Sequence, residues 1–264
     1  MLIDQESLTS INSKLIDQES LTSINSLDSL SPMERDELLL KSFEQKSQRD
    51  DFVLFFYLWE HETVSLGKAQ RSKKVLLDEL KQLGIKSSIR PTGGKTIFHF
   101  SDVSFTFIAK QDSPIFGGSL RDSYGKSIGF LKQILFDFFL EYYSWDLLES
   151  ISNVNEAVNC SGSGFMQNCF DSSYSCELLL NYDNQARKIL GSAQTMYANS
   201  FLQQGSVLVN SSQNYFGPIK DLSFYRDYIS LVDIFNNSQD IDLKILVEDL
   251  NLFIAESLKV EVVL

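Results

Sequence analysis

Strand-like and helix-like segments follow one another in this chain without strict strand–helix–strand alternation. The near-continuous apolar and aromatic run over residues 52–59 is typical of a buried strand. Apolar residues with helical spacing predict helices over residues 33–46 and 120–143. Because regular alternation would indicate a parallel α/β sheet, this pattern predicts an α+β domain instead. We expect a mixed, largely antiparallel sheet flanked by helices.

The remaining patterned segments predict short strands, further helices and a hairpin. Gly84 is expected to end a helix in the left-handed conformation, and Asp183-Asn184-Gln185 to turn a hairpin. The expected strands are residues 64–67, 85–89, 97–99, 103–109, 176–182, 188–191, 201–209 and 260–264, and the further helices are residues 72–83 and 242–258.

The N-terminus carries a direct repeat, in which residues 2–13 recur as residues 15–26 with Lys14 between them. Two short copies are too few to stack as a solenoid, so we interpret them as a tandem duplication. Only one copy can take a given place in a fold, and the second copy adjoins the rest of the chain. We therefore expect residues 1–14 to be a disordered extension and residues 15–264 to form one domain.

The charge and cysteine content exclude several classes of protein. With 23 Lys and Arg against 35 Asp and Glu, the net charge of −12 argues against nucleic acids and anionic membranes as partners. No stretch of 18 apolar residues and no N-terminal targeting signal occur. Three cysteines without a Cys-x-x-Cys pair, beside two histidines, predict no metal site. We expect a reduced, cytoplasmic protein.

A glycine-rich loop separates two expected short strands, in the sequence Arg90-Pro91-Thr92-Gly93-Gly94-Lys95-Thr96-Ile97-Phe98-His99. Adjacent glycines permit positive φ and let a ligand approach the backbone closely. The N–H groups of such a loop can hold a carboxylate, a phosphate or an acyl carbonyl, and Arg90 and Lys95 add positive charge. On the glycines alone, however, a plain hairpin turn is the favoured interpretation.

Two later residues are candidates for nucleophilic chemistry. Cys169 follows a Gly/Ser/Asn-rich stretch, and a cysteine becomes a nucleophile where a neighbour lowers its pKa. Lys188 enters a Gly-Ser-Ala turn, where an ammonium group can stabilise an anion or act as a base. Taken singly, Cys169 is more simply a small buried residue and Lys188 a solvated one. Cys160 lies in the same stretch as Cys169 and is its main rival.

The order of these segments resembles the lipoate–protein ligase and octanoyltransferase family, which has the biotin/lipoate ligase catalytic-domain fold. In that family a glycine-rich, arginine-containing motif ends in histidine and precedes a Lys-Ile-x-Gly-Ser-Ala motif. A strand with Gln-Gly or His-Gly then follows. Residues 90–99, residues 188–193 and Gln204-Gly205 are similar to these motifs, and residues 64–70 to an earlier one. The resemblance runs from residue 15 to about residue 209 and implies that residues 15–264 form the catalytic domain.

The resemblance also implies the branch of the family and its site. ATP-dependent ligases carry Asn-Asp before the lysine motif, where this chain has Cys169-Phe170-Asp171. A cysteine-dependent octanoyltransferase is therefore implied, with Cys169 as nucleophile and Lys188 as its cationic partner. Backbone N–H groups near Gly93-Gly94 or Gly191-Ser192 would hold the oxyanion. The implied substrate-binding residues are Arg90, Thr92, Gly93, Gly94, His99, Gly191, Ser192, Ala193 and Gln194.

The implied reaction moves an octanoyl or lipoyl group from acyl carrier protein, through a cysteine thioester, to a lysine of a lipoyl domain or of the glycine-cleavage H protein. Such an exchange needs no cofactor and no metal, and we expect a monomer. Two alternatives stay open. An ATP-dependent lipoate ligase would use ATP and Mg²⁺ and leave Cys169 as a bystander. A non-catalytic relative would bind carrier or lipoyl domains. Departures from the family pattern at Lys95, Phe100 and residues 195–197 motivate the latter.

Overall fold

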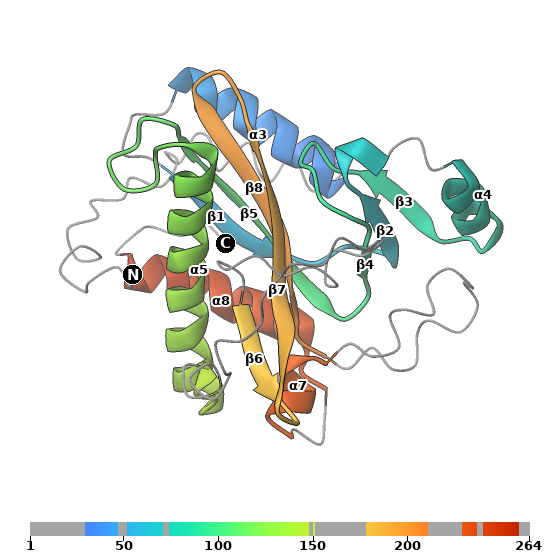
Figure 1. Ribbon diagram of the computed structural model, residues 1–264, viewed down its shortest axis with the longest axis vertical. Coiled ribbons are helices and arrows are strands. Elements are labelled where there is room, and N and C mark those ends of the chain that lie inside the picture. The colour runs from blue at the N-terminus through green and yellow to red at the C-terminus, as the bar shows by residue number, and fades with distance from the viewer. Residues whose placement is uncertain are drawn as a thin grey trace.

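The computed structural model describes residues 30–46, 52–70, 74–147, 150, 178–210, 229–236 and 240–258. They form a five-stranded sheet and a separate three-stranded sheet, with helices packed against both (Figure 1). Of the two sheets, the larger supplies the main core and the smaller carries the glycine-rich loop at its edge. This is the mixed α+β architecture that the sequence pattern predicts.

The larger sheet is antiparallel throughout and has the order β1-β5-β8-β7-β6. Its strands are β1 (Phe52–Tyr57), β5 (Asp102–Lys110), β6 (Leu178–Tyr182), β7 (Gln185–Met196) and β8 (Ser200–Leu208). Strands β5 and β8 lie in the middle and are buried along their whole lengths. Because successive side chains of a strand point to opposite faces, these two strands present a different set of residues to each side of the sheet.

One side of the sheet, the α5 face, is covered by α5 (Leu120–Tyr143) and α8 (Leu243–Ser257) (Figure 1). The core here is aromatic, with Phe52, Phe107, Phe116 and Phe130 in mutual ring contact. Helix α5 begins at a capping box in which Ser119 and Asp122 satisfy each other's backbone N–H groups. It ends at Ser144, whose φ of 57° is left-handed.

The opposite side, the α3 face, is covered in part by α3 (Pro32–Lys46). Leu39, Leu40 and Phe43 of this helix pack against Ile108 and Leu202 of the two central strands. Toward the other end of the same strands, the side chains on this face become polar. A small apolar cluster therefore anchors α3, and the remainder of the face is left for the polar site described below.

The smaller sheet has the order β3-β2-β4, from β2 (Thr63–Leu66), β3 (Lys86–Ile89) and β4 (Ile97–His99). Strands β2 and β3 are parallel, whereas β2 and β4 are antiparallel. Helix α4 (Lys74–Gln82) follows the short η1 (Lys68–Gln70) and packs against β3, and Figure 1 shows α4 at the edge of the molecule away from α5. Another short helix, α7 (Leu231–Ile234), contacts β6.

Most predicted elements are confirmed within a few residues, including the long helix at residues 120–143. Gly84 follows α4 with a φ of 71°, as predicted for a helix end. Asp183 and Asn184 form a two-residue turn with φ values of 51° and 57°, between the paired residues Tyr182 and Gln185. That geometry matches the twist of the flanking strands.

Some predicted bounds are wrong. The strand predicted over residues 188–191 extends over Gln185–Met196, because cross-strand pairing with β8 continues through its polar half. Helix α7 was not predicted, since four residues are too few to show helical periodicity. The predicted strand at residues 260–264 and the predicted extension at residues 1–14 lie outside the described residues.

Among the described helices, none is long and apolar enough to cross a membrane. In the same residues, no three His, Cys, Asp or Glu side chains come together in a way that could hold a metal ion.

Candidate functional site

Buried polar residues line the α3 face of the two central strands. Asp102, Ser104 and Thr106 alternate along β5, and Ser206 and Gln204 lie opposite the last two on β8. Because partners in an antiparallel pair share a face, these five side chains form one continuous polar stripe. Buried polar groups are costly unless they are hydrogen-bonded, so such a stripe needs partners on the segments that cover it.

The glycine-rich loop, residues 91–95, lies over this stripe and is held by the buried side chain of Arg90. One terminal nitrogen, Nη1, donates to the carbonyl oxygen of Ser65 at 2.9 Å and to its hydroxyl at 2.5 Å. The other, Nη2, donates to the carbonyl oxygens of Gly93 at 3.2 Å and Lys95 at 2.6 Å. A planar guanidinium can hold several acceptors in a fixed arrangement, so Arg90 ties the loop to strand β2.

Glycine is needed in this region for more than one reason. A Cβ added to Gly67 would lie 2.1 Å from the carbonyl oxygen of Gly94, so the loop packs directly on Gly67. Gly94 itself has a φ of 84°, which favours glycine. Gly93 is different: an added Cβ would meet nothing within 4 Å. The surface of the loop beside Gly93 is therefore open.

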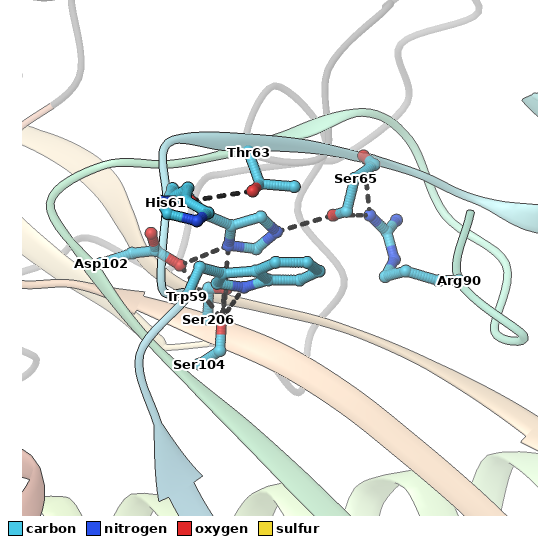
Figure 2. Close-up of polar contacts among 9 residues, drawn as sticks. Trp59, His61, Thr63, Ser65, Arg90, Asp102, Ser104 and Ser206 are labelled. Carbon is cyan, nitrogen blue, oxygen red and sulfur yellow. Dashed lines mark hydrogen bonds and ion pairs between the residues drawn. The ribbon is translucent and has the colours of Figure 1, made fainter. Parts of the chain in front are cut away.

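His99 connects Ser65 to Asp102 beneath the loop. The distance from His99 Nε2 to the Ser65 hydroxyl is 2.7 Å, and that from Nδ1 to Asp102 Oδ2 is 2.8 Å. All three side chains are buried. Ser65 contacts both Arg90 and His99, and Asp102 contacts the other ring nitrogen of His99; Figure 2 shows Ser65 beside Arg90, with Asp102 at the opposite end of the group. A hydrogen-bonded chain therefore runs from Asp102 to the guanidinium of Arg90.

Trp59 fixes the plane of the His99 ring. The two rings stack with centroids 4.4 Å apart and an interplanar angle of 22°. The indole Nε1 donates to the Ser104 hydroxyl at 3.1 Å, and Ser104 contacts Ser206 at 3.0 Å (Figure 2). The imidazole ring is thus held by stacking on its face and by hydrogen bonds at both nitrogens.

A second hydrogen-bonded chain reaches the loop from α3. The Thr92 hydroxyl donates to Gln204 Oε1 at 2.9 Å, and Gln204 Nε2 donates to Asp36 Oδ2 at 2.5 Å. The Thr106 hydroxyl donates to the same Asp36 oxygen at 2.7 Å. Asp36 is fully buried, and this desolvation raises the pKa of its carboxyl despite the nearby Arg35 and these donors. Burial also raises the pKa of Tyr57, with the charge of Asp36 adding to the effect.

Lys188 reaches the α3 face through an irregularity in β7. Leu178 and Leu180 of β6 lie in the main core, and the register between β6 and β7 shifts at Leu178 and Leu179. Lys188 pairs with Leu179, so it lies on the face opposite to Leu178 and Leu180. A β-bulge of this kind redirects a side chain. Without it, Lys188 would share the face of Leu190 and Ser192.

The register places the rest of the lysine motif on both faces. Gly191 pairs with Ser206 and Ala193 with Gln204, so both lie on the α3 face with the polar stripe. Ser192 and Gln194 lie on the other face and contact α5. The Ser192 hydroxyl donates to the Tyr124 hydroxyl at 2.9 Å, and Gln194 Nε2 donates to the Ser123 hydroxyl at 3.1 Å.

Gln203 completes this contact with α5. Its Nε2 donates to the Ser192 hydroxyl at 3.0 Å, and its Oε1 accepts a hydrogen bond from Ser127. The side chains of Ser192 and Gln194 thus join the sheet to helix α5, while their backbone belongs to the strand that carries Lys188.

The structure therefore gathers Arg90, Thr92 and His99 around the glycine-rich loop. It also sets Lys188, Gly191 and Ala193 on the sheet face that carries the polar stripe. Cys169, proposed as the nucleophile, lies outside the described residues, as do Cys160 and Cys176. Ser65, Asp102, Trp59 and Asp36 were not identified from the sequence. For Asp102 a signal existed, because it precedes the strand predicted over residues 103–109 and continues the alternation of the polar residues 104 and 106.

Comparisons with known proteins identify the family of the chain. Residues 28–223 match the family model described as the lipoyl protein ligase A/B catalytic domain. The chain is 28% identical over 165 residues to octanoyltransferase LipM of Lysinibacillus sphaericus, covering 61% of this chain and 55% of that protein. It is 30% identical over 190 residues to octanoyltransferase LipM of Staphylococcus aureus, covering 69% of this chain and 63% of that protein. The matched region is thus little more than half of each relative.

Solved structures share the fold. A crystal structure of lipoate-protein ligase A bound with ATP superposes with a TM-score of 0.51 at 18% identity, covering 87% of this chain and 80% of that one. A protein from T. acidophilum with bound lipoic acid superposes with a TM-score of 0.50 at 17% identity, covering 86% and 82%. At these identities the similarity establishes the architecture only.

Proposed function

Because this chain belongs to the lipoyl protein ligase A/B catalytic domain family, we propose that it is an octanoyltransferase of protein lipoylation. It takes an octanoyl or lipoyl group from acyl carrier protein, carries it as a thioester on Cys169, and transfers it to a lysine of a lipoyl domain or of the glycine-cleavage H protein. The single observation that carries this proposal is the shared face: the glycine-rich loop lies over the sheet face to which the β-bulge directs Lys188.

Three further observations support the proposal. Two relatives that the chain resembles over more than half its length are octanoyltransferases. Cys169 stands in the sequence where the ATP-dependent branch of the family carries Asn-Asp. The open surface beside Gly93 offers the loop backbone to an acyl group.

In the first step, the Cys169 thiolate attacks the thioester carbonyl of the acyl carrier protein. The new C–S bond forms as the carbonyl becomes an oxyanion, and loop N–H groups stabilise that charge. The bond to the carrier sulfur then breaks, and the carrier leaves as a thiol after taking a proton. The positive charge of Lys188 favours the thiolate form of the cysteine before attack.

In the second step, the acceptor lysine attacks the Cys169 thioester as a neutral amine. An amide bond forms, the bond to the Cys169 sulfur breaks, and the amine loses a proton. The acyl group is already activated as a thioester at both stages. We therefore propose that the reaction proceeds without ATP, metal or cofactor. We also propose that the enzyme is a monomer in the cytoplasm.

The experiment that tests the proposal is intact-mass analysis after incubation with octanoyl-acyl carrier protein, without ATP. We expect the wild-type mass to rise by one octanoyl group, and the adduct to be released by hydroxylamine, which cleaves thioesters. Cys169→Ser should abolish this adduct, whereas Cys160→Ser and Cys176→Ser should retain it.

Addition of a lipoyl domain should then discharge the adduct and acylate the acceptor. A hydroxylamine-sensitive adduct that persists in Cys169→Ser would refute the assignment of the nucleophile. Pyrophosphate release that depends on free lipoate and ATP, with no adduct on any cysteine, would instead identify an ATP-dependent ligase. Binding of the carrier without any adduct would identify a non-catalytic relative.

A further inference from the structure

The direction of the loop N–H groups follows from the contacts of Arg90. Arg90 Nη2 holds the carbonyl oxygen of Gly93, and the peptide bond between Gly93 and Gly94 is trans. In a planar trans peptide the C=O and the N–H point in opposite directions. The Gly94 N–H must therefore point away from the guanidinium.

One side of the loop is packed and open space lies beside Gly93. The carbonyl oxygens of Gly93 and Gly94 both lie close to Gly67, whereas an added Cβ at Gly93 would meet open space. Within the described part of the chain, the Gly94 N–H has no hydrogen-bond acceptor. A backbone donor that is held rigidly and lacks an internal acceptor is suited to an oxyanion.

One assignment of donors and acceptors fits the hydrogen bonds that run from Asp102 to Arg90. A guanidinium only donates, so the Ser65 hydroxyl oxygen accepts from Arg90 and its own hydrogen is available for His99 Nε2. His99 Nε2 is then the acceptor, and Nδ1 carries the hydrogen that Asp102 Oδ2 accepts. Asp102 thereby selects the tautomer of His99, and through Ser65 this tautomer orients Arg90.

We propose that Asp102, His99 and Ser65 are positioning residues that lock Arg90, and that Arg90 in turn directs the Gly94 N–H at the oxyanion of the acyl-transfer step. The inference rests on the proposed acyltransferase function and names the backbone donor and its support. It also gives Asp102 a role, although the family's usual aspartate position, directly after the histidine, holds Phe100 here.

The distances from Ser65 to His99 and from His99 to Asp102 are those found between a serine nucleophile and its base. Burial of Ser65 excludes a role as a nucleophile. The Ser65 side chain is fully buried, and its oxygen already accepts from Arg90. A substrate carbonyl has no path to it. The hydroxyl can transmit orientation and cannot attack.

The test compares Ser65→Ala with the wild type in single-turnover acylation by octanoyl-acyl carrier protein. The variant removes the hydroxyl that joins Arg90 to His99 and adds no volume. We expect the maximal acylation rate constant to fall about tenfold, less than the roughly hundredfold loss typical of deleting a donor outright. The carrier concentration at half-maximal rate should change little, because binding of the carrier does not use the oxyanion contact.

Alkylation of Cys169 by iodoacetamide, followed by peptide mass, gives a readout that passes through no oxyanion. In Ser65→Ala, the rate of Cys169 alkylation should stay within about twofold of that of the wild type. Ser113→Ala is the matched control, since Ser113 is also buried and accepts two backbone N–H bonds, in the turn after β5. Its acylation rate should equal that of the wild type.

An unchanged acylation rate in Ser65→Ala would overturn the proposal, and so would an equal loss of acylation and alkylation, which would indicate a general structural effect.

If Ser65→Ala does not fold, Asp102→Asn serves instead, since an amide at this position donates to Nδ1 and reverses the tautomer of His99. The same selective loss of acylation is expected. If the wild type itself forms no acyl adduct while Cys169 alkylates normally, the proposed function fails, and that result differs from every result above.

Discussion

At the scale of single residues, glycines with similar sequence surroundings have different physical reasons to be glycine. Gly67 is required by packing, because the carbonyl oxygens of the loop occupy the place of its side chain. Gly94 is favoured by its positive φ. Gly93 has neither requirement, since an added Cβ there would meet open space and its φ is not positive. Under the proposed function, a bound acyl group close to the backbone would be a reason for glycine at this position.

We therefore predict that two alanine substitutions affect different quantities, one the acylation rate and the other the free energy of unfolding. Gly93→Ala should leave the free energy of unfolding within about 0.5 kcal/mol of the wild type, while slowing acylation by octanoyl-acyl carrier protein. Gly67→Ala should lower the free energy of unfolding by about 1–3 kcal/mol, as overpacking does. Urea denaturation and the acylation assay measure the two quantities. Equal acylation by Gly93→Ala and the wild type would show that no ligand uses the open space.

At the scale of elements, the bulge between β6 and β7 matters most. Strict alternation would place Lys188 on the α5 face, among apolar side chains. The register shift turns it to the α3 face, while its neighbour Arg187 pairs with Leu180 and shares the α5 face. The adjacent residues Arg187 and Lys188 thus place their positive charges on opposite faces of the sheet.

This arrangement predicts a difference between two neighbouring substitutions. Lys188→Met should shift the pH at which Cys169 alkylation reaches half its maximal rate upward, because a nearby cation stabilises the thiolate. Arg187→Met removes the same charge from the opposite face and should leave that pH unchanged. Iodoacetamide kinetics between pH 5 and about pH 10, with peptide mass identification, test both. A shift of equal size in the two variants would mean that the effect is only one of net charge.

At the scale of the whole molecule, the site lies at the junction of two sheets and α3. The smaller sheet contributes Ser65 and His99, and Arg90 follows its strand β3. The larger sheet contributes Asp102 and Gln204, and α3 contributes Asp36. Such a junction is polar and yet buried, so it carries titratable groups whose charge affects folding.

Asp36 makes this coupling measurable. Its pKa is raised in the folded protein above the ordinary 3.8, so the folded state binds the proton more tightly than the unfolded state. The stability that this group contributes is therefore complete below pH 3.8 and is lost as pH rises through the folded pKa. The free energy of unfolding of Asp36→Asn, minus that of the wild type, should increase with pH above 3.8.

Asp122 supplies a control of opposite sign. Hydrogen bonds from Ser119 lower the pKa of its carboxyl below 3.8, so its stabilising effect is present above that pH and is lost as pH falls through the folded pKa. Asp122→Asn should differ from the wild type most at neutral pH and least in acid. Urea denaturation across the pH range measures both, and a flat difference for Asp36→Asn would contradict the argument.

Much of the architecture could be predicted because it depends on local patterns. The aromatic run that became β1, the long helix α5 and the Asp183-Asn184 turn each follow from residues close together in the chain. The order of the motifs also indicated the family, which the matched family model confirms. For the candidate site, Arg90, Thr92, His99 and Lys188 were identified as candidates, but their contacts were not.

The sequence by itself determined the type of most described elements, the family and a set of candidate site residues, since side-chain periodicity and motif order are properties of the chain. Only the tertiary structure decided which residues meet. Thr92 meets Gln204 although 112 residues separate them along the chain, and Lys188 faces the site because one register shift reverses its direction. Contacts of this kind depend on pairing between distant segments, and a displacement of one residue changes the face of every side chain that follows.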